Sequence, residues 1–212
     1  MEELLQYLLE KYGYDEPIFS RDLCKNLNVK GTTLRQNLKR LIDSNRLERY
    51  ENGIYFIPKP NSLFKKKSLS FNKVINKKYL LDQDKIIGYR TGIAFANDLR
   101  LTTQTAGVLE IATNKETNRK RKVQINNHSL ILRKPRIKIT EENYKILQVL
   151  DLITDVEKMS EKSLDKTYYQ VKDYVKNINL DKIKLNRILD HYPAKTKIQL
   201  YESGLLNELT RG

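Results

Sequence analysis

Three stretches in the first sixty residues show the apolar spacing of amphipathic helices. The predicted helices cover residues 2–12, 21–27 and 32–43. Gly13 is expected to end the first helix, and Ser20 to be the N-cap of the second. In the third helix, apolar residues recur at i, i+4, i+7 and i+8, which predicts a buried face made of Leu34, Leu38, Leu41 and Ile42.

The third predicted helix has a polar face opposite this apolar stripe. Thr33 and Gln36 have the spacing of a capping box at its start. Its polar residues are Thr32, Thr33, Arg35, Gln36, Lys39 and Arg40. Because no acidic residue occurs between Lys30 and Arg40, this face is expected to be positively charged.

A β-hairpin is predicted directly after the three helices. Residues 46–50 and 54–57 are the expected strands, and Asn52-Gly53 between them favours a two-residue type I′ turn. Three helices followed by a two-stranded wing are the element order of a winged helix-turn-helix. Residues 1–60 are therefore predicted to form a DNA-binding domain.

The third helix would enter the major groove of DNA, which admits one α-helix. Arg35 and Gln36 could read base edges, because Arg bridges two acceptors of guanine and Gln pairs with adenine. The expected phosphate contacts come from Thr32, Thr33, Lys39 and Arg40 on the helix, with Arg49 and Asn52 on the wing. The alternative is a protein-binding three-helix module whose basic face is only solvated.

The remainder of the chain alternates helical and extended patterns. Residues 61–81 are predicted as a basic connector with a short helix over 72–81, and residues 82–212 as a second domain. In this domain, helices are expected at 93–99, 140–153, 168–176, 181–190 and 193–209, and strands at 108–112, 119–125 and 129–133. The fold is therefore predicted to be mainly α with small β elements, which is the α+β class.

The positive charge is concentrated in the middle third of the chain. The sequence has 40 basic and 26 acidic residues, a formal net charge of +14, and residues 61–140 hold 18 of the basic and 5 of the acidic ones, a net +13. The basic residues singled out there are Lys65, Lys66, Lys67, Lys73, Lys77, Lys78, Arg119, Lys120, Arg121, Lys122, Arg133, Lys134, Arg136 and Lys138. Such a field attracts polyanions, so nucleic acid is expected as a partner in preference to a surface that is only solvated.

Composition argues against several other classes of protein. The single cysteine, Cys24, excludes an intramolecular disulfide and a multi-cysteine metal site, and it is expected to be a small core residue. No apolar run approaches the ~18 residues that span a bilayer. The first ten residues lack the basic start of a secretory signal. A cytoplasmic protein without a membrane partner is therefore expected.

The sequence contains no catalytic motif, so the chain is not expected to be an enzyme, and no cofactor or metal is expected. His128 in a predicted turn and His191 at a helix end have no nucleophile in a recognisable frame. Asp151 and Asp155 share one face of a predicted helix with Lys158 nearby, which favours an ordinary surface network.

The segment from Gly88 to Asn114 has a pattern of its own. It begins with a glycine and an aromatic residue, continues with a small-residue helix and a Leu-Thr-Thr-Gln step, and ends with a strand closing on Thr-Asn. The residues that carry the pattern are Gly88, Tyr89, Gly92, Leu101, Thr102, Thr103, Gln104, Thr113 and Asn114. After a predicted winged helix, this segment resembles the AbiEi-type antitoxin family of type IV toxin–antitoxin and abortive-infection systems, and the resemblance would extend over nearly the whole chain.

This resemblance implies an N-terminal winged helix-turn-helix and a C-terminal α/β antitoxin-like domain. The first would repress the protein's own operon by binding inverted repeats in double-stranded promoter DNA. The second would counter a nucleotidyltransferase-like toxin in abortive phage infection, without a stable complex.

The residues themselves leave other functions open. One is a protein- or RNA-binding module with a toxin or tRNA partner, in which the winged helix is a scaffold. Another is a repressor that responds to a ligand held in an apolar pocket of the second domain. A monomer that binds paired DNA sites cooperatively and a preformed dimer both fit the sequence.

Overall fold

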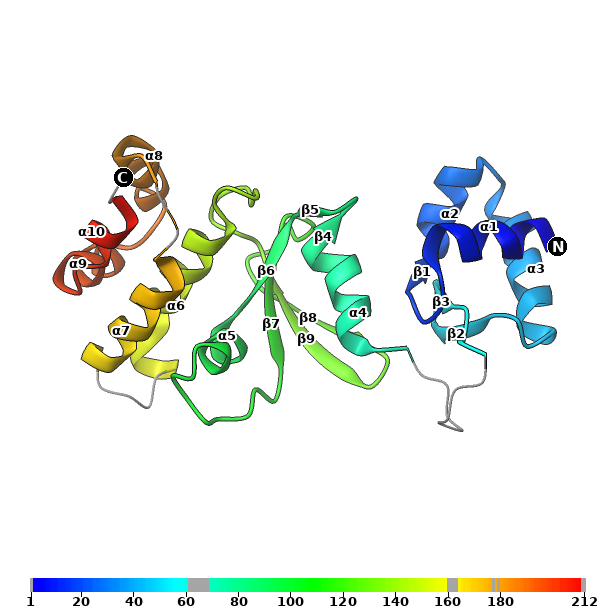
Figure 1. The fold of residues 1–212 in the computed structure, drawn as a ribbon, viewed down its shortest axis with the longest axis horizontal. Coiled ribbons are helices and arrows are strands. Elements are labelled where there is room, and N and C mark those ends of the chain that lie inside the picture. Colours follow the sequence, from blue (N-terminus) through cyan, green and yellow to red (C-terminus); the bar gives the residue numbers. More distant parts are fainter. Residues whose placement is uncertain (1, 61–68, 160–163, 177, 179, 211–212) are drawn as a thin grey trace. The chain divides into compact units, whose positions relative to one another are not determined.

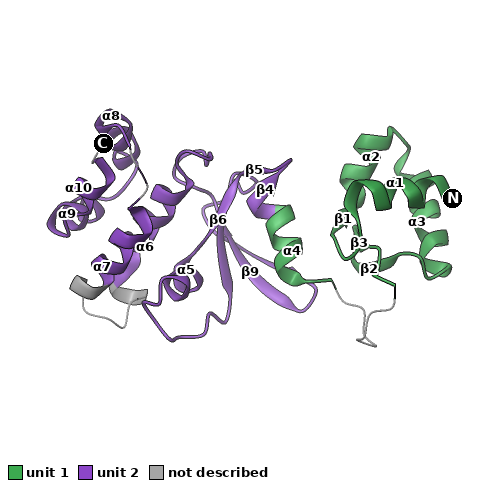
Figure 2. Ribbon diagram, in the orientation of Figure 1, with its two compact units in different colours: residues 1–78 green, residues 79–212 purple. Residues whose placement is uncertain are grey.

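The computed structural model describes residues 2–60, 69–159, 164–176, 178 and 180–210, and it combines helices with short strands (Figure 1). The predicted α+β class is therefore confirmed. The chain divides into two compact units, Met1–Lys78 and Tyr79–Gly212, which Figure 2 shows in different colours. Each of the two units has its own cluster of buried apolar side chains.

Besides α4 (Phe71–Ile75), the first unit contains three helices and a small antiparallel sheet. The helices are α1 (Glu2–Tyr12), α2 (Ser20–Leu27) and α3 (Gly31–Asp43), and the strands are β1 (Ile18–Phe19), β2 (Glu48–Glu51) and β3 (Ile54–Phe56), in the order β1-β3-β2. Their apolar stripes meet in one core made of Leu5, Leu8, Ile18, Leu23, Leu34, Leu38, Leu41, Leu47, Tyr55 and Ile57. The three predicted helices and the hairpin are confirmed. Cys24 is half-buried and packs against this core, as the sequence predicts.

The hairpin differs from the prediction in two details. Ser20 is the first residue of α2 rather than its N-cap, because the helix begins directly after β1 with Phe19 as the N-cap; the Ser20 N–H donates to the Gly53 carbonyl at 3.0 Å. The predicted type I′ turn is also wrong, since Gly53 has a φ of +80° but Asn52 does not have the positive φ that this turn requires. The pairing register shifts between Arg49 and Glu51, so a bulge in β2 accompanies the turn.

The start of α3 also differs from the prediction. The helix begins at Gly31, with Lys30 as its N-cap and no side-chain capping bond. The Leu34 N–H donates to the Lys30 carbonyl at 3.0 Å and thereby closes the first turn. Thr33 lies inside this turn, so the predicted capping box with Gln36 is wrong.

The second unit contains a four-stranded mixed sheet. Its strands are β6 (Gly88–Thr91), β7 (Leu109–Thr113), β8 (Arg121–Ile125) and β9 (His128–Arg133), in the order β6-β7-β9-β8. The pair β7–β9 is parallel, and the other neighbours are antiparallel. The three predicted strands are confirmed as β7, β8 and β9. His128 belongs to β9 rather than to a turn, because it pairs with Ile125.

Helices cover part of this sheet. The helix α5 (Gly92–Asp98) follows β6, and α6 (Tyr144–Met159) packs against α5 and β6. The remaining helices are α7 (Leu164–Val175), α8 (Lys182–Leu189), α9 (Ala194–Glu202) and α10 (Leu205–Thr210). Before the sheet lie α4 (Phe71–Ile75), a π-helical turn (Asn76–Leu80) and the hairpin of β4 (Leu81–Asp82) and β5 (Lys85–Ile86).

Four predicted helices differ in extent from the observed ones. The helix expected over 72–81 is α4 followed by a π-helical turn that ends at Leu80, and the helix expected over 168–176 begins at Leu164 as α7. The helix expected over 193–209 is interrupted at Gly204, where a φ of +69° separates α9 from α10. The spacing of Ile198, Tyr201, Leu205 and Leu209 predicts an apolar stripe along this helix. Ile198 and Tyr201 are nevertheless 54% and 71% exposed, because α9 packs through its other face. The helix α6 starts at Tyr144 rather than at residue 140. Within the described residues, no helix has both the length and the apolar character required to cross a membrane.

Candidate nucleic-acid interface

The outer face of α3 carries all six polar residues predicted for it. The opposite face is buried through Leu34, Leu38 and Leu41, each 1% exposed. The solvent-exposed residues are Thr32, Thr33, Arg35, Gln36, Lys39 and Arg40. The Nε of Arg35 donates to the Gly31 carbonyl at 3.1 Å, which holds the guanidinium along the first turn and uses one of its five N–H donors.

The electrostatics of this face follow from the absence of acidic neighbours. Among the described residues, no carboxylate lies within ion-pair distance of Arg35, Lys39 or Arg40. The amino-terminal end of a helix adds a partial positive charge to the side chains of its first turn. The face therefore attracts anions, and because it is exposed the attraction is weakened by salt.

The hairpin presents a second polar group. The Nη2 of Arg49 donates to Oδ1 of Asn52 at 3.0 Å, and its Nε donates to the Glu51 carbonyl at 3.4 Å. Both Arg49 and Asn52 are exposed. These bonds hold the arginine at the turn of the hairpin, where the guanidinium remains open to solvent.

The predicted basic connector is engaged within the first unit where the structure describes it. Lys65, Lys66 and Lys67 lie outside the described residues. Lys73 pairs with Glu16 Oε1 at 2.5 Å, and Lys77 Nζ lies 4.4 Å from the ring centroid of Tyr12. Burial lowers the pKa of Lys78, against the opposing influence of Glu51.

Arg121 is held by a buried carboxylate. Its Nε and Nη2 both lie 2.8 Å from Oε2 of Glu116, which is only 4% exposed. The other oxygen of Glu116 accepts the backbone N–H groups of Thr117 and Asn118, each at 3.0 Å. Burial on its own would raise the pKa of Glu116, but these hydrogen bonds and Arg121 hold it below its ordinary value. Arg121 thus fixes the loop between β7 and β8.

Arg133 and Lys120 share one acidic partner. Glu110 on β7 accepts Lys120 Nζ at 3.1 Å through Oε1 and lies 3.5 Å from Arg133 Nη1 through Oε2. Of the cations singled out in the second unit, Arg119, Lys122, Lys134 and Lys138 are exposed at the surface of this sheet and of the segment that follows it.

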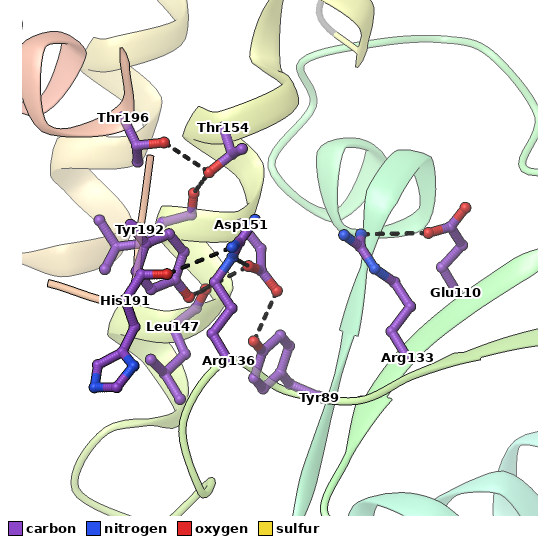
Figure 3. A network of polar contacts seen from close by, with 11 residues as sticks. Tyr89, Glu110, Arg133, Arg136, Leu147, Asp151, Thr154, His191, Tyr192 and Thr196 are labelled. Atoms are coloured by element: carbon purple, nitrogen blue, oxygen red, sulfur yellow. Dashed lines mark hydrogen bonds and ion pairs between the residues drawn. The ribbon is translucent and has the colours of Figure 1, made fainter. Parts of the chain in front are cut away.

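The centre of the second unit holds a polar network that the sequence does not reveal (Figure 3). Asp151, 8% exposed, accepts the Tyr89 hydroxyl at 2.8 Å and the Tyr192 hydroxyl at 3.2 Å. Arg136 Nε is 3.8 Å from the same carboxylate, and the guanidinium lies 4.9 Å from the centroid of the Tyr192 ring. Burial raises the pKa of Asp151, although Tyr89, Arg133 and Arg136 oppose this. Burial and the charge of Asp151 raise the pKa of both tyrosines, which therefore donate as phenols.

This network corrects the prediction of an ordinary surface pair at Asp151 and Asp155. Asp151 faces the core, because α6 buries its neighbours Leu147, Leu150 and Leu152. The sequence does contain an indication that Asp151 is buried, because this carboxylate lies inside the mainly apolar run from 146 to 153. A charged residue in such a run requires buried partners, but the sequence does not say which distant residues supply them.

The residues of the Gly88–Asn114 pattern hold the second unit together. A Cβ at Gly88 would lie 2.2 Å from the Tyr79 carbonyl, so only glycine fits this position. The Thr113 hydroxyl donates to the same carbonyl at 2.7 Å. The side chain of Asn114 bonds both the N–H and the carbonyl of Ile139, each at 2.9 Å. These contacts give the pattern a structural role.

No group of His, Cys, Asp or Glu side chains in the described ranges could hold a metal ion. No protein-family model matches the chain, and no curated protein matches its sequence.

Proposed function

We propose that the chain is a DNA-binding transcriptional autorepressor whose first unit is a winged helix-turn-helix. One observation carries this proposal. The exposed face of α3 presents two threonines, a glutamine and three cations over a buried leucine stripe, and no acidic residue occurs from Lys30 to Arg40. This combination suits a helix that lies in the major groove of double-stranded DNA.

The side chains divide into two roles in this proposal. Arg35 and Gln36, in the amino-terminal half of α3, are the residues whose chemistry fits base edges. Thr32, Thr33, Lys39 and Arg40 bind phosphates and add no sequence information. On the second unit, the exposed Lys122, Lys134 and Lys138 add to the long-range attraction of the polyanion.

The antitoxin part of the proposal rests on the resemblance between residues 88–114 and the AbiEi-type family. In this proposal the second unit counters a nucleotidyltransferase-like toxin encoded beside the chain, without a stable complex. The two roles are separable, since base reading belongs to α3 and antitoxicity to the second unit.

The DNA-binding role is tested by titrating the full chain with its own promoter fragment and with a random duplex of the same length. Arg35→Ala should lose about 1–3 kcal/mol of binding free energy on the promoter and little on random DNA, if Arg35 makes a bidentate base contact. Lys25→Ala on α2 is the matched control, because Lys25 is an exposed cation of the same unit outside α3. Equal losses on both duplexes for Arg35→Ala would contradict base reading by this residue.

The antitoxin role is tested by co-expression with the product of the adjacent reading frame. The wild-type chain and Arg35→Ala should both restore growth, because the variant changes only the first unit. Continued growth arrest in the presence of the wild-type chain would count against the antitoxin role.

A further inference from the structure

An open pocket of about 460 Å³ lies within the second unit, lined by residues of β7, β9, α5 and α6 and of the β7–β8 loop. Small-molecule sites in proteins commonly have volumes of ~300–1,000 Å³, so this one has the size of a binding site. The residues that line it are Gly92, Ile93, Glu110, Arg119, Lys120, Arg133 and Asp155. Four separate elements and the β7–β8 loop contribute them, so the tertiary fold creates the pocket.

The sheet register explains why the charged groups converge. Ala112 of β7 is paired with Arg133 of the parallel neighbour β9, so Glu110, two residues earlier, points to the same face as Arg133. Figure 3 shows these two side chains directed toward each other above the strands. Lys120, the last residue of the β7–β8 loop, reaches Glu110 at 3.1 Å. Asp155 comes from the kink of α6, where its φ of −120° departs from helical geometry.

The pocket is charged. It therefore differs from the apolar pocket that the sequence leaves open for a ligand-responsive repressor. Among the lining residues whose side chains the structure describes, Arg119, Lys120 and Arg133 oppose Glu110 and Asp155, so three cations minus two carboxylates give them a formal charge of +1. The contacts to Glu110 use one donor of Lys120 and one of Arg133, while a lysine carries three donors and an arginine five. The cations therefore retain donors for an anionic ligand.

Gly92 lines the pocket at the start of α5. Its φ of +68° is a conformation that a residue with a side chain rarely adopts. A Cβ at this position would make only ordinary contacts of 3.5–3.6 Å with the side chain of Glu110, so the positive φ, and not a lack of space, favours glycine here. The second glycine of the Gly-Tyr-Arg-Thr-Gly segment thus belongs to the pocket.

We propose that this pocket binds a ribonucleoside phosphate. A bare phosphate would satisfy the three cations but would be repelled by the two carboxylates. A ribonucleotide supplies both halves of the required chemistry, because its phosphates pair with the cations and its ribose hydroxyls donate to the carboxylates. Ile93 offers apolar contact to the base. This site is distinct from the α3 face and does not depend on DNA binding.

The test is isothermal titration of the full chain, without DNA and in metal-free buffer, with ATP, GTP, CTP and UTP in separate runs. At least one should bind saturably at one site per chain. The matching deoxyribonucleotide should bind about tenfold more weakly, because one donor to a carboxylate is lost, which corresponds to ~1.4 kcal/mol. Inorganic phosphate should bind more weakly still.

Variants locate the site. Lys120→Ala and Arg119→Ala should each weaken the nucleotide at least about tenfold, a loss of ~1.4 kcal/mol or more. The matched control is Lys138→Ala, since Lys138 is an exposed cation of the same unit that does not line the pocket, and it should change the affinity less than about twofold. Circular dichroism should show the same fold for all three variants, because these side chains are largely exposed.

Three results would overturn the proposal. The first is that none of the four nucleotides binds saturably. The second is that Lys138→Ala weakens binding as much as Lys120→Ala, which indicates diffuse charge attraction. The third is that phosphate binds as tightly as the nucleotide. A chain that binds nucleotide but not its promoter would leave this site standing while contradicting the DNA-binding role.

Discussion

Two groups of cations in this protein have opposite surroundings. On α3, Arg35, Lys39 and Arg40 are exposed and have no carboxylate within ion-pair distance among the described residues. In the second unit, Arg121 is bound to a buried glutamate, and Arg136 reaches a buried aspartate and the Tyr192 ring. The first group is open to a partner from outside the chain. The second group holds the chain's own loops and helices.

The comparison shows that the number of positive charges in a segment is a poor guide to their role. The middle third carries a net charge of +13, yet several of its arginines contact acidic groups that the fold brings to them. The segment from Lys30 to Arg40 contributes only four cations but no acidic residue. An exposed cation without an acidic neighbour keeps its full attraction for an anion, while a neighbouring carboxylate reduces that attraction.

The largest expected effect is at Asp151. Asp151→Ala should lower the free energy of unfolding by about 3 kcal/mol, because two buried tyrosine hydroxyls and Arg136 lose their common acceptor. Urea denaturation followed by circular dichroism measures the loss. The control is Asp173→Ala on α7, an exposed carboxylate whose removal should cost less than about 0.5 kcal/mol. Similar losses in the two variants would refute a structural role for the network.

A smaller and pH-dependent effect is expected at Glu116. Because its folded-state pKa lies below the ordinary 4.5, the stability from its carboxylate is fully present above that value and is lost as pH falls through the lower folded pKa. Glu116→Gln should cost about 1.5 kcal/mol near neutral pH, since the bond from Arg121 loses its charged acceptor. The difference from the wild type should shrink in strong acid.

Denaturation of the wild type and of Glu116→Gln at a series of pH values measures this difference. The exposed Glu141→Gln, which lies before α6, should follow the wild type throughout. A difference for Glu116→Gln that stays constant down to strong acid would exclude the charge of Glu116 as its cause.

The smallest effect on stability is expected on α3. Arg40→Ala should change the free energy of unfolding by less than about 0.5 kcal/mol, because Arg40 is exposed and outside the core. The same change should reduce the salt dependence of DNA binding by about one phosphate contact. Affinity measured over a range of salt concentrations gives this slope. The control is Arg187→Ala on α8, an exposed arginine of the second unit, which should leave the salt dependence of DNA binding unchanged. An equal reduction in this control would contradict the distinction between the cations of α3 and those of the second unit.

Most of the secondary structure could be predicted from the sequence, because it depends on local periodicity. The apolar stripe of Leu34, Leu38 and Leu41 sets both the extent of α3 and the side it buries. The details that failed involve contacts with distant residues. Ser20 starts α2 beside the hairpin, where its N–H donates to the Gly53 carbonyl, and Ile198 is exposed because other residues of α9 face the core.

The candidate sites differ in the same way. The polar face of α3 could be predicted from one segment of sequence, since helical spacing alone separates it from the buried leucines. The pocket could not be predicted, because Gly92, Glu110, Lys120, Arg133 and Asp155 come from elements that meet only through the sheet register and the kink of α6.

The sequence by itself determined the α+β class, the helices and hairpin of the first unit, and the chemical character of the α3 face, because each depends on residues a few positions apart. Only the tertiary structure decided which cations pair with carboxylates, where Asp151 is buried and how the charged pocket forms. The physical reason is that a side chain's electrostatic partners are set by distance in space, and a periodic pattern along the chain carries no information about that distance.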